Sequence, residues 1–298
     1  MSFRRSNSGL SNLRLFYRVD AVVFVEGGGR NLSLEEVAGG AFNEIAHDAK
    51  FWSLIFRKLL PKFRFKFRAV GSKPTLLELA SLITSEQIVR VIVCMDRDLD
   101  NYLGRAVRHP RVAYTHGYSW ENDAWSLRST LGVFRKLNNA ADPAPAISEI
   151  KTSFAAFRRQ LQWPLCAHAL LVASGILEVT TADLEQTVTR GAGQMPALNC
   201  ARLRAAVRDA RRKSPQTVVK YPNPARFSVF DDCYGHLLST FAFHTVAYAL
   251  RKHCNIRAFG KDVAASLAIE SSYAAISANK TKKLHYLNQA LAISRSIS

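Results

Sequence analysis

The chain has 298 residues, of which 48% are hydrophobic, so it can build a large core and belongs to the globular rather than the disordered class. It carries 41 Lys and Arg residues against 23 Asp and Glu residues, a formal net charge of +18. This balance favours a polyanionic partner, above all nucleic acid, over a neutral small molecule. Residues 151–298 hold 20 of the basic residues but only 8 of the acidic ones, so most of the excess lies in the second half.

The five cysteines are widely spaced and odd in number, which predicts reduced thiols rather than a disulfide framework. The N-terminal residues are basic but lack the apolar core of a signal peptide. The longest apolar stretch, residues 236–250, is interrupted by Ser, Thr and His and therefore predicts a buried helix rather than a membrane span. We expect a cytoplasmic protein without a membrane partner.

Strands and helices alternate along the first half of the chain. The predicted elements are a strand ending at Val25, a helix over 34–55 interrupted at Gly39 and Gly40, a strand at 62–68, a helix at 74–83, a strand at 89–95, a short strand at 112–115 and a helix at 121–137. Ser33 and Glu36 form a capping box, and Pro74 suits a first helical turn. Such alternation predicts an α/β fold with a parallel sheet and flanking helices.

The segment 138–146, "NNAADPAPA", is rich in turn formers and is the best domain boundary. We therefore predict one domain over residues 15–137 and an α-helical domain over residues 147–298 that supplies partner and substrate contacts. Helical patterns occur at 147–171, 181–189, 197–213, 233–253 and 261–277, and an extended insertion is expected at 218–230. The basic run 208–213 is explained by a helix end, where cations interact favourably with the helix dipole, so we assign it no substrate.

Basic and aromatic residues alternate in "KFRFKFR", residues 62–68. The period of two predicts a strand with its phenylalanines on the core side and its cations on the other side. The cations Lys62, Arg64, Lys66 and Arg68 are candidate nucleic-acid contacts. The alternative is the solvated face of an edge strand.

Carboxylates follow two of the predicted strands. Glu26 follows the first, and "DRDLDN" places Asp96, Asp98 and Asp100 at alternate positions after the strand at 89–95. Ends of adjacent parallel strands lie about 5 Å apart, so Glu26 and Asp96 can share one hard cation, and Asp98 points the same way if the chain stays extended. Mg²⁺ prefers such oxygen ligands. The alternative is a solvated acidic loop that caps the next helix.

Four blocks occur in order along the first half: "VEGGGR", "GSKP", "DRDLDN" and "YSWENDAW". A strand ending in Glu-Gly, followed by a strand ending in Asp-x-Asp, resembles the TOPRIM domain of topoisomerases, primases, recombination proteins and overcoming-lysogenization-type nucleases. This resemblance covers approximately residues 19–137. The four blocks together resemble the TOPRIM-like effector nucleases of bacterial anti-phage defence, in particular the AriB-type effectors of the PARIS system.

The resemblance implies that Glu26, Asp96 and Asp98 are catalytic metal-site carboxylates for Mg²⁺, with Mn²⁺ as the alternative ion. It makes Asp100 and Glu121 weaker candidates for a second cation, although Glu121 is equally well explained as a first-turn acid of a helix. Lys73 could meet a substrate phosphate beside the metal, or it could simply be solvated.

The resemblance also implies a toxic effector that an ABC-type ATPase holds silent until infection releases it as a homodimer. It implies cleavage of host RNA, with tRNA favoured. Two alternatives stay open at this stage: a TOPRIM-type DNA nuclease, and a non-catalytic module that binds the ATPase or nucleic acid. "EGGGR" lacks the Gly-Lys-Ser/Thr ending of a P-loop, so ATP hydrolysis by this chain is not expected.

Overall fold

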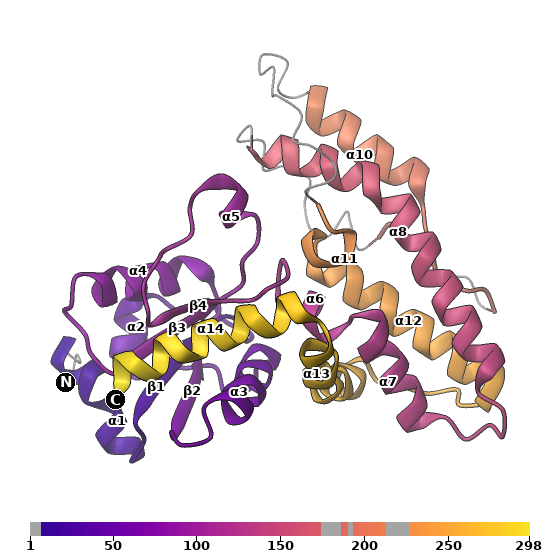
Figure 1. The fold of residues 1–298 in the computed structure, drawn as a ribbon. Helices are drawn as coiled ribbons and strands as arrows, with labels where there is room; N and C mark the ends of the chain where they lie inside the picture. Colours follow the sequence, from indigo (N-terminus) through magenta and orange to yellow (C-terminus); the bar gives the residue numbers. More distant parts are fainter. Residues whose placement is uncertain (1–6, 174–185, 190–192, 213–226) are drawn as a thin grey trace. The chain divides into compact units, whose positions relative to one another are not determined.

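The computed structural model describes residues 7–173, 186–189, 193–212 and 227–298. They form two compact units (Figure 1). Unit 1 contains residues up to Arg97, Gly104–His116 and Ile276–Ser298, and unit 2 contains Asp98–Leu103 and Gly117–Ala275.

Unit 1 is built on a four-stranded parallel sheet. Its strands are β1 (Ala21–Val25), β2 (Phe65–Ala69), β3 (Val91–Met95) and β4 (Val112–Tyr114), in the spatial order β2-β1-β3-β4. The two central strands, β1 and β3, are buried along their whole length, as expected for strands covered on both faces. The pairing of Val25 with Cys94 sets the carboxyl ends of β1 and β3 side by side.

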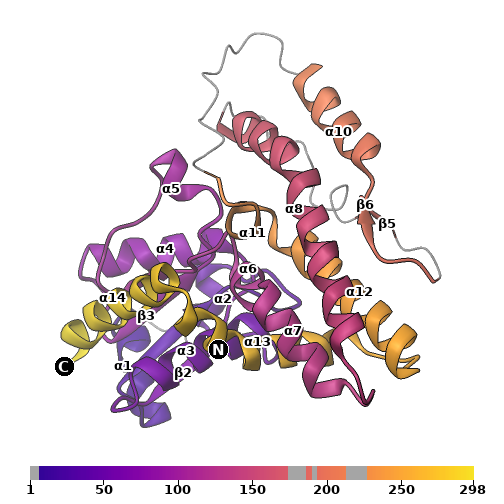
Figure 2. The same ribbon diagram turned by 45° about the vertical axis from the view of Figure 1, so that its right-hand side comes forward.

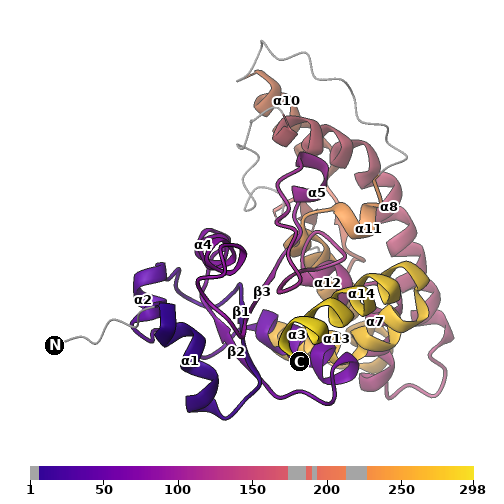
Figure 3. The same ribbon diagram turned by 60° about the vertical axis from the view of Figure 1, so that its left-hand side comes forward.

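Helices cover both faces of this sheet (Figure 3). The helices α1 (Asn7–Tyr17), α2 (Leu34–Ala38) and α4 (Lys73–Thr84) pack into one apolar core with the sheet. On the other face lie α3 (His47–Leu59) and α14 (Lys280–Ile297), where Tyr286 meets the rings of Phe51 and Trp52 at centroid distances of 6.2 and 5.9 Å. The last helix of the chain therefore completes the first unit.

Unit 2 is mainly helical (Figure 2). Its elements are α5 (Asp100–Leu103), α6 (Trp120–Ala124), α7 (Leu127–Leu137), α8 (Ala144–Ala173), α10 (Cys200–Arg212), α11 (Val229–Asp232), α12 (Gly235–Cys254), most of α13 (Lys261–Ala278), and the antiparallel pair β5 (Val188–Thr189) and β6 (Ala197–Leu198). Its core joins α8 to α12, where the Phe157 and Phe241 rings lie 4.3 Å apart.

Most of the predicted elements are confirmed, including the parallel sheet, the interruption after Ala38 and the Ser33–Glu36 capping box. The helix predicted at 121–137 is two helices, α6 and α7. The helical prediction for 181–189 is wrong at Val188–Thr189, which form β5, and its residues 181–185 lie outside the described residues. Residues 218–226 of the predicted extended insertion also lie outside them.

The two compact units divide the chain at other places, and the domains at 15–137 and 147–298 stay a prediction. Residues 117–137 belong to unit 2, and α14 belongs to unit 1.

Among the described residues, no helix combines the length and the apolarity that crossing a membrane requires.

Candidate metal centre

Glu26 and Asp96 lie at the carboxyl ends of the two central strands, β1 and β3. The Asp96 main-chain N–H donates to Glu26 Oε1 over 2.8 Å. Both residues are partly exposed. The hydrogen bond joins the Glu26 carboxylate to the main chain of Asp96, so two residues with oxygen-donor side chains, the ligands that Mg²⁺ prefers, lie next to each other at this edge of the sheet. The predicted adjacency of Glu26 and Asp96 is confirmed.

The glycines after Glu26 allow the chain to turn sharply between two neighbours. Gly27 and Gly28 have φ values of +87° and +101°, and a Cβ on either would collide with the side chain of Asp48 or Asn43, respectively. Asn43 Nδ2 in turn donates to the carbonyl of Gly27 over 3.3 Å and to that of Arg30 over 2.9 Å. The Asn43 side chain therefore holds the main chain of the loop that follows Glu26.

Lys73 lies in the same part of unit 1. It is the first residue of α4, and its Nζ donates to the main-chain carbonyl of Asp96 over 2.7 Å. Gly71, with φ +94°, lets the preceding turn pass directly against Arg30 and Asn31. The ammonium group therefore lies beside the strand end that carries Asp96 and places a positive charge there.

Asp98 and Asp100 belong to unit 2. The chain does not stay extended after Asp96, because Asp98 has the left-handed φ of +49° and its N–H donates to the Tyr118 carbonyl over 2.7 Å. The condition for Asp98 to point the same way as Asp96 is therefore not met. Asp100 is the first residue of the short helix α5.

Glu121 is a buried carboxylate in unit 2, only 4% exposed. Its Oε2 accepts from Ser119 Oγ over 2.6 Å, and His236 Nε2 lies 3.6 Å from Oε1. The neighbouring Asn122 donates to the carbonyls of Phe230 and Cys233, both over 2.9 Å. "YSWENDAW" thus joins α6 to the start of α12, which gives this block a structural role.

Two further acidic residues, Asp48 and Asp123, are buried, although their sequence context did not distinguish them. Asp48 of α3 is buried, and it lies against the loop that follows Glu26. Asp123 is buried in unit 2, and its carboxylate oxygen lies within 4.8 Å of that of Asp231. In sequence both resemble ordinary acids of a first helical turn, so only their burial distinguishes them.

The cysteines near these residues remain protonated. Burial raises the pKa of the Cys94 thiol well above its ordinary value. Burial, together with the carboxylates of Asp231 and Asp232, also raises the pKa of Cys233. All five cysteines are free, as predicted. Both thiols are therefore uncharged at neutral pH in the metal-free protein.

The "KFRFKFR" segment has the predicted two faces. Phe65 and Phe67 pack against Phe56 of α3, although both are only partly buried. On the other face the Arg68 guanidinium lies 4.8 Å from the Tyr17 ring centroid and donates to the Tyr17 hydroxyl over 2.8 Å. Lys66 Nζ lies 5.4 Å from the same ring, whereas Lys62 and Arg64 are exposed. Contacts of these four cations with nucleic acid stay a prediction.

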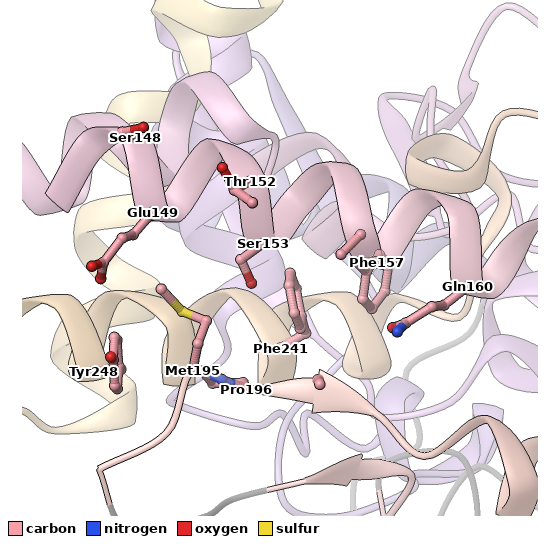
Figure 4. A pocket seen from close by; sticks show the side chains of 12 residues that line it. Ser148, Glu149, Thr152, Ser153, Phe157, Gln160, Met195, Pro196, Phe241 and Tyr248 are labelled. Carbon is pink, nitrogen blue, oxygen red and sulfur yellow. The ribbon is translucent and has the colours of Figure 1, made fainter. Parts of the chain in front are cut away.

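Unit 2 contains a cavity of about 370 Å³ between α8, α12 and residues 195–197 (Figure 4). Its walls include Phe157, Phe241 and Met195. The Ser153 hydroxyl points from α8 toward α12, and it has no hydrogen-bond partner within the described part of the chain. Glu149, at one end, accepts from Lys252. This lining suits an uncharged group rather than a metal ion.

No family model and no curated protein matches this sequence. The assignment of a function therefore rests on the residues and their geometry.

Proposed function

We propose that this protein is a TOPRIM-type, Mg²⁺-dependent nuclease. The observation that carries the proposal is the pairing of Glu26 with Asp96 at the ends of two adjacent parallel strands, joined by the 2.8 Å hydrogen bond from the Asp96 amide. Carboxyl ends of parallel strands are the usual place for ligands in open α/β sheets. The order of the four sequence blocks further supports the TOPRIM assignment.

The residues of unit 1 account for binding and orientation of a phosphodiester. Glu26 and Asp96 would hold Mg²⁺, which when bound polarises the phosphate and lowers the pKa of a bound water. The Asp96 amide orients the Glu26 carboxylate, and Lys73 adds a positive charge beside Asp96 for a substrate phosphate. From the resemblance alone, Asp98 stays a proposed ligand as the second aspartate of Asp-x-Asp, although its backbone does not continue the extended direction of Asp96, and Asp100 and Glu121 stay candidates for a second ion.

The biological setting is proposed from the resemblance alone. The protein acts as a toxic effector in anti-phage defence, cleaves host RNA with tRNA favoured, and is held silent by an ABC-type ATPase until it is released as a homodimer. The net charge of +18 supports a polyanionic substrate, RNA or DNA.

Cleavage by purified protein tests the proposal. Wild type is incubated with total cellular RNA and with plasmid DNA, each with Mg²⁺ or with EDTA. We expect Mg²⁺-dependent cleavage of RNA and its loss in Glu26→Gln, Asp96→Asn and Asp98→Asn. Each change removes a charge while conserving shape: Gln can still accept from the Asp96 amide, and Asn tolerates the left-handed backbone of residue 98.

Glu78→Gln is the matched control, since Glu78 is an exposed carboxylate on α4 of the same unit. It should cleave like wild type. Wild-type cleavage by all three folded site variants would refute the proposed metal centre. Absence of cleavage under every metal condition would instead favour the non-catalytic module.

A further inference from the structure

The outer faces of α8 and α10 combine exposed arginines with one exposed tryptophan. We call this set the arginine–tryptophan surface; it consists of Arg158, Arg159 and Trp163 of α8 and Arg204, Arg208 and Arg212 of α10. All of these residues belong to unit 2, and all are exposed.

The packing of the two helices explains why these side chains face water. α8 buries Phe154, Phe157 and Leu161, so Arg159 and Trp163 lie on its opposite, exposed side and Arg158 lies at the margin of the buried face. α10 lies alongside α8 (Figures 1 and 2) and buries Leu203. Arg204, Arg208 and Arg212 recur every four residues, which places them in one row along the exposed side of α10.

Trp163 is the exception among the four tryptophans of the chain. Its exposed fraction is 58%, whereas those of Trp52, Trp120 and Trp125 are 2%, 7% and 1%. Arg159 lies one turn before Trp163 on the same face of α8. A large ring left in water beside cations is the arrangement that proteins use to stack a base next to a bound phosphate.

The positive charge of α10 is nearly uncompensated within the helix. Residues 200–212 contain five arginines and a single acid, Asp209. Asp209 lies 3.9 Å from Arg212, and both side chains are largely exposed, so this ion pair neutralises little of the field. A partner for this surface must therefore bring several negative charges as well as an apolar face.

We propose that the arginine–tryptophan surface binds single-stranded RNA, with the arginines on consecutive phosphates and a base stacked on Trp163. A single strand fits better than a duplex because its bases are free to stack, whereas those of a duplex are paired inside the helix. This inference rests on the proposed nuclease function, and it assigns substrate capture to helices of unit 2 rather than to the Glu26–Asp96 strand ends.

The fluorescence of Trp163 can report the binding of RNA to this surface. The full-length Glu26→Gln variant is titrated in EDTA with single-stranded oligo(A), and tryptophan fluorescence is recorded, since the other three tryptophans are buried and out of reach of the oligonucleotide. We expect quenching that Trp163→Ala abolishes, together with a roughly five- to hundredfold loss of affinity measured by filter binding. Trp163→Phe should retain part of the affinity, because a smaller ring still stacks.

The charges are tested by the salt dependence of binding. Arg204→Gln/Arg208→Gln should make the log-log slope shallower by about 1.4 units, since each single-strand phosphate contact contributes about 0.7. The control is Arg257→Gln/Lys261→Gln, which removes two exposed cations four residues apart elsewhere in unit 2. It should leave the slope unchanged.

The inference is overturned if oligo(A) does not quench Trp163 fluorescence, or if the α10 variant and its control give equal slopes. Tight binding of duplex RNA alone, or of anionic vesicles but not oligo(A), would also overturn it. An equal response to oligo(dA) would extend the surface to single strands in general. If oligo(A) binds but no metal-dependent cleavage occurs, the RNA-binding surface is retained and the nuclease function is refuted. If the wild type cleaves RNA but the surface variants bind oligo(A) as tightly as wild type does, the nuclease function is retained and the RNA-binding surface is refuted.

Discussion

At the scale of single residues, the Glu26 carboxylate is oriented by a main-chain amide, while glycines let its loop pass between side chains of α3 and neighbouring segments. Gly71 is the tightest of these positions, because its missing Cβ would run into the main chain of Arg30 and Asn31 rather than into a flexible side chain. The N–H of Gly27 also donates to the Gly71 carbonyl over 3.1 Å. The backbone at residue 71 therefore supports the loop that presents Glu26.

We expect Gly71→Ala to lower the free energy of unfolding by about 1–3 kcal/mol, since a non-glycine residue at φ +94° is strained and the added methyl group displaces backbone. Urea denaturation measures this change. Gly29→Ala is the matched control, because a Cβ at residue 29 has nothing within 4 Å. Equal stabilities of the two variants would show that the loop adapts and does not hold Glu26 rigidly.

The sequence predicted Glu26 and Asp96 together because both follow buried strands, and adjacent parallel strands end at the same edge. It could not predict the conformation at Asp98. A left-handed residue there depends on the hydrogen bond with Tyr118, twenty residues later in the chain. The burial of Asp48 and Asp123 likewise depends on tertiary packing that local patterns do not encode.

At the scale of elements, the contact between α8 and α12 combines an aromatic core with a charged end. Phe157 and Phe241 form the core, and at the end Glu149 Oε1 accepts from Lys252 Nζ over 2.5 Å while His253 Nε2 lies 3.2 Å from Oε2. The hydrogen bond from Lys252, helped by that with His253, lowers the pKa of Glu149 below its ordinary value, although partial burial opposes the shift. This contact is therefore sensitive to acid.

Because the pKa of Glu149 is lower in the folded state, its contribution is fully present above about pH 4.5 and is lost as the pH falls through the folded-state pKa. We expect the difference in unfolding free energy between wild type and Glu149→Gln to shrink as the pH falls below 4.5. Urea titrations from neutral to acidic pH measure it, with Glu78→Gln as the control for an exposed carboxylate. A difference that is constant across this range would contradict the assignment.

The sequence predicted α8, α10, α12 and α13 within a few residues, but it missed β5, β6 and α14. The two strands have only two residues each, too few to show a period. In α14 the pattern is misleading, because Leu284 and Leu291 are 46% and 47% exposed whereas Lys282 is buried. Buried Tyr286, Ala290, Ile293 and Ile297 do recur at helical spacing, but the exposed leucines beside them obscure the face that packs on the sheet.

At the scale of the whole molecule, the chain leaves unit 1 for the last time after His116 and returns to it at Ile276, near the end of α13. Gln289 of α14 accepts from the Tyr114 main-chain N–H over 2.6 Å and donates to its carbonyl over 3.0 Å. The Tyr286 hydroxyl accepts from the His116 amide over 3.2 Å. The sheet that carries Glu26 and Asp96 is thus completed by the last twenty residues, although they lie far from it in sequence.

We predict that deletion of residues 279–298 destabilises unit 1 before unit 2. The deletion removes Tyr286 from the rings of Phe51 and Trp52 and leaves the main chain of β4 without its partners in α14. Limited proteolysis should cut the sheet segments first, and metal-dependent cleavage should be lost.

Tyr286→Ala, which removes one fully buried ring, should lower the free energy of unfolding by about 3–5 kcal/mol, as measured by urea denaturation. Leu291→Ala is the control, since it shortens a half-exposed side chain of the same helix and should have a small effect. A deleted chain with wild-type protease resistance and cleavage would show that residues 15–137 fold alone, as the sequence first indicated.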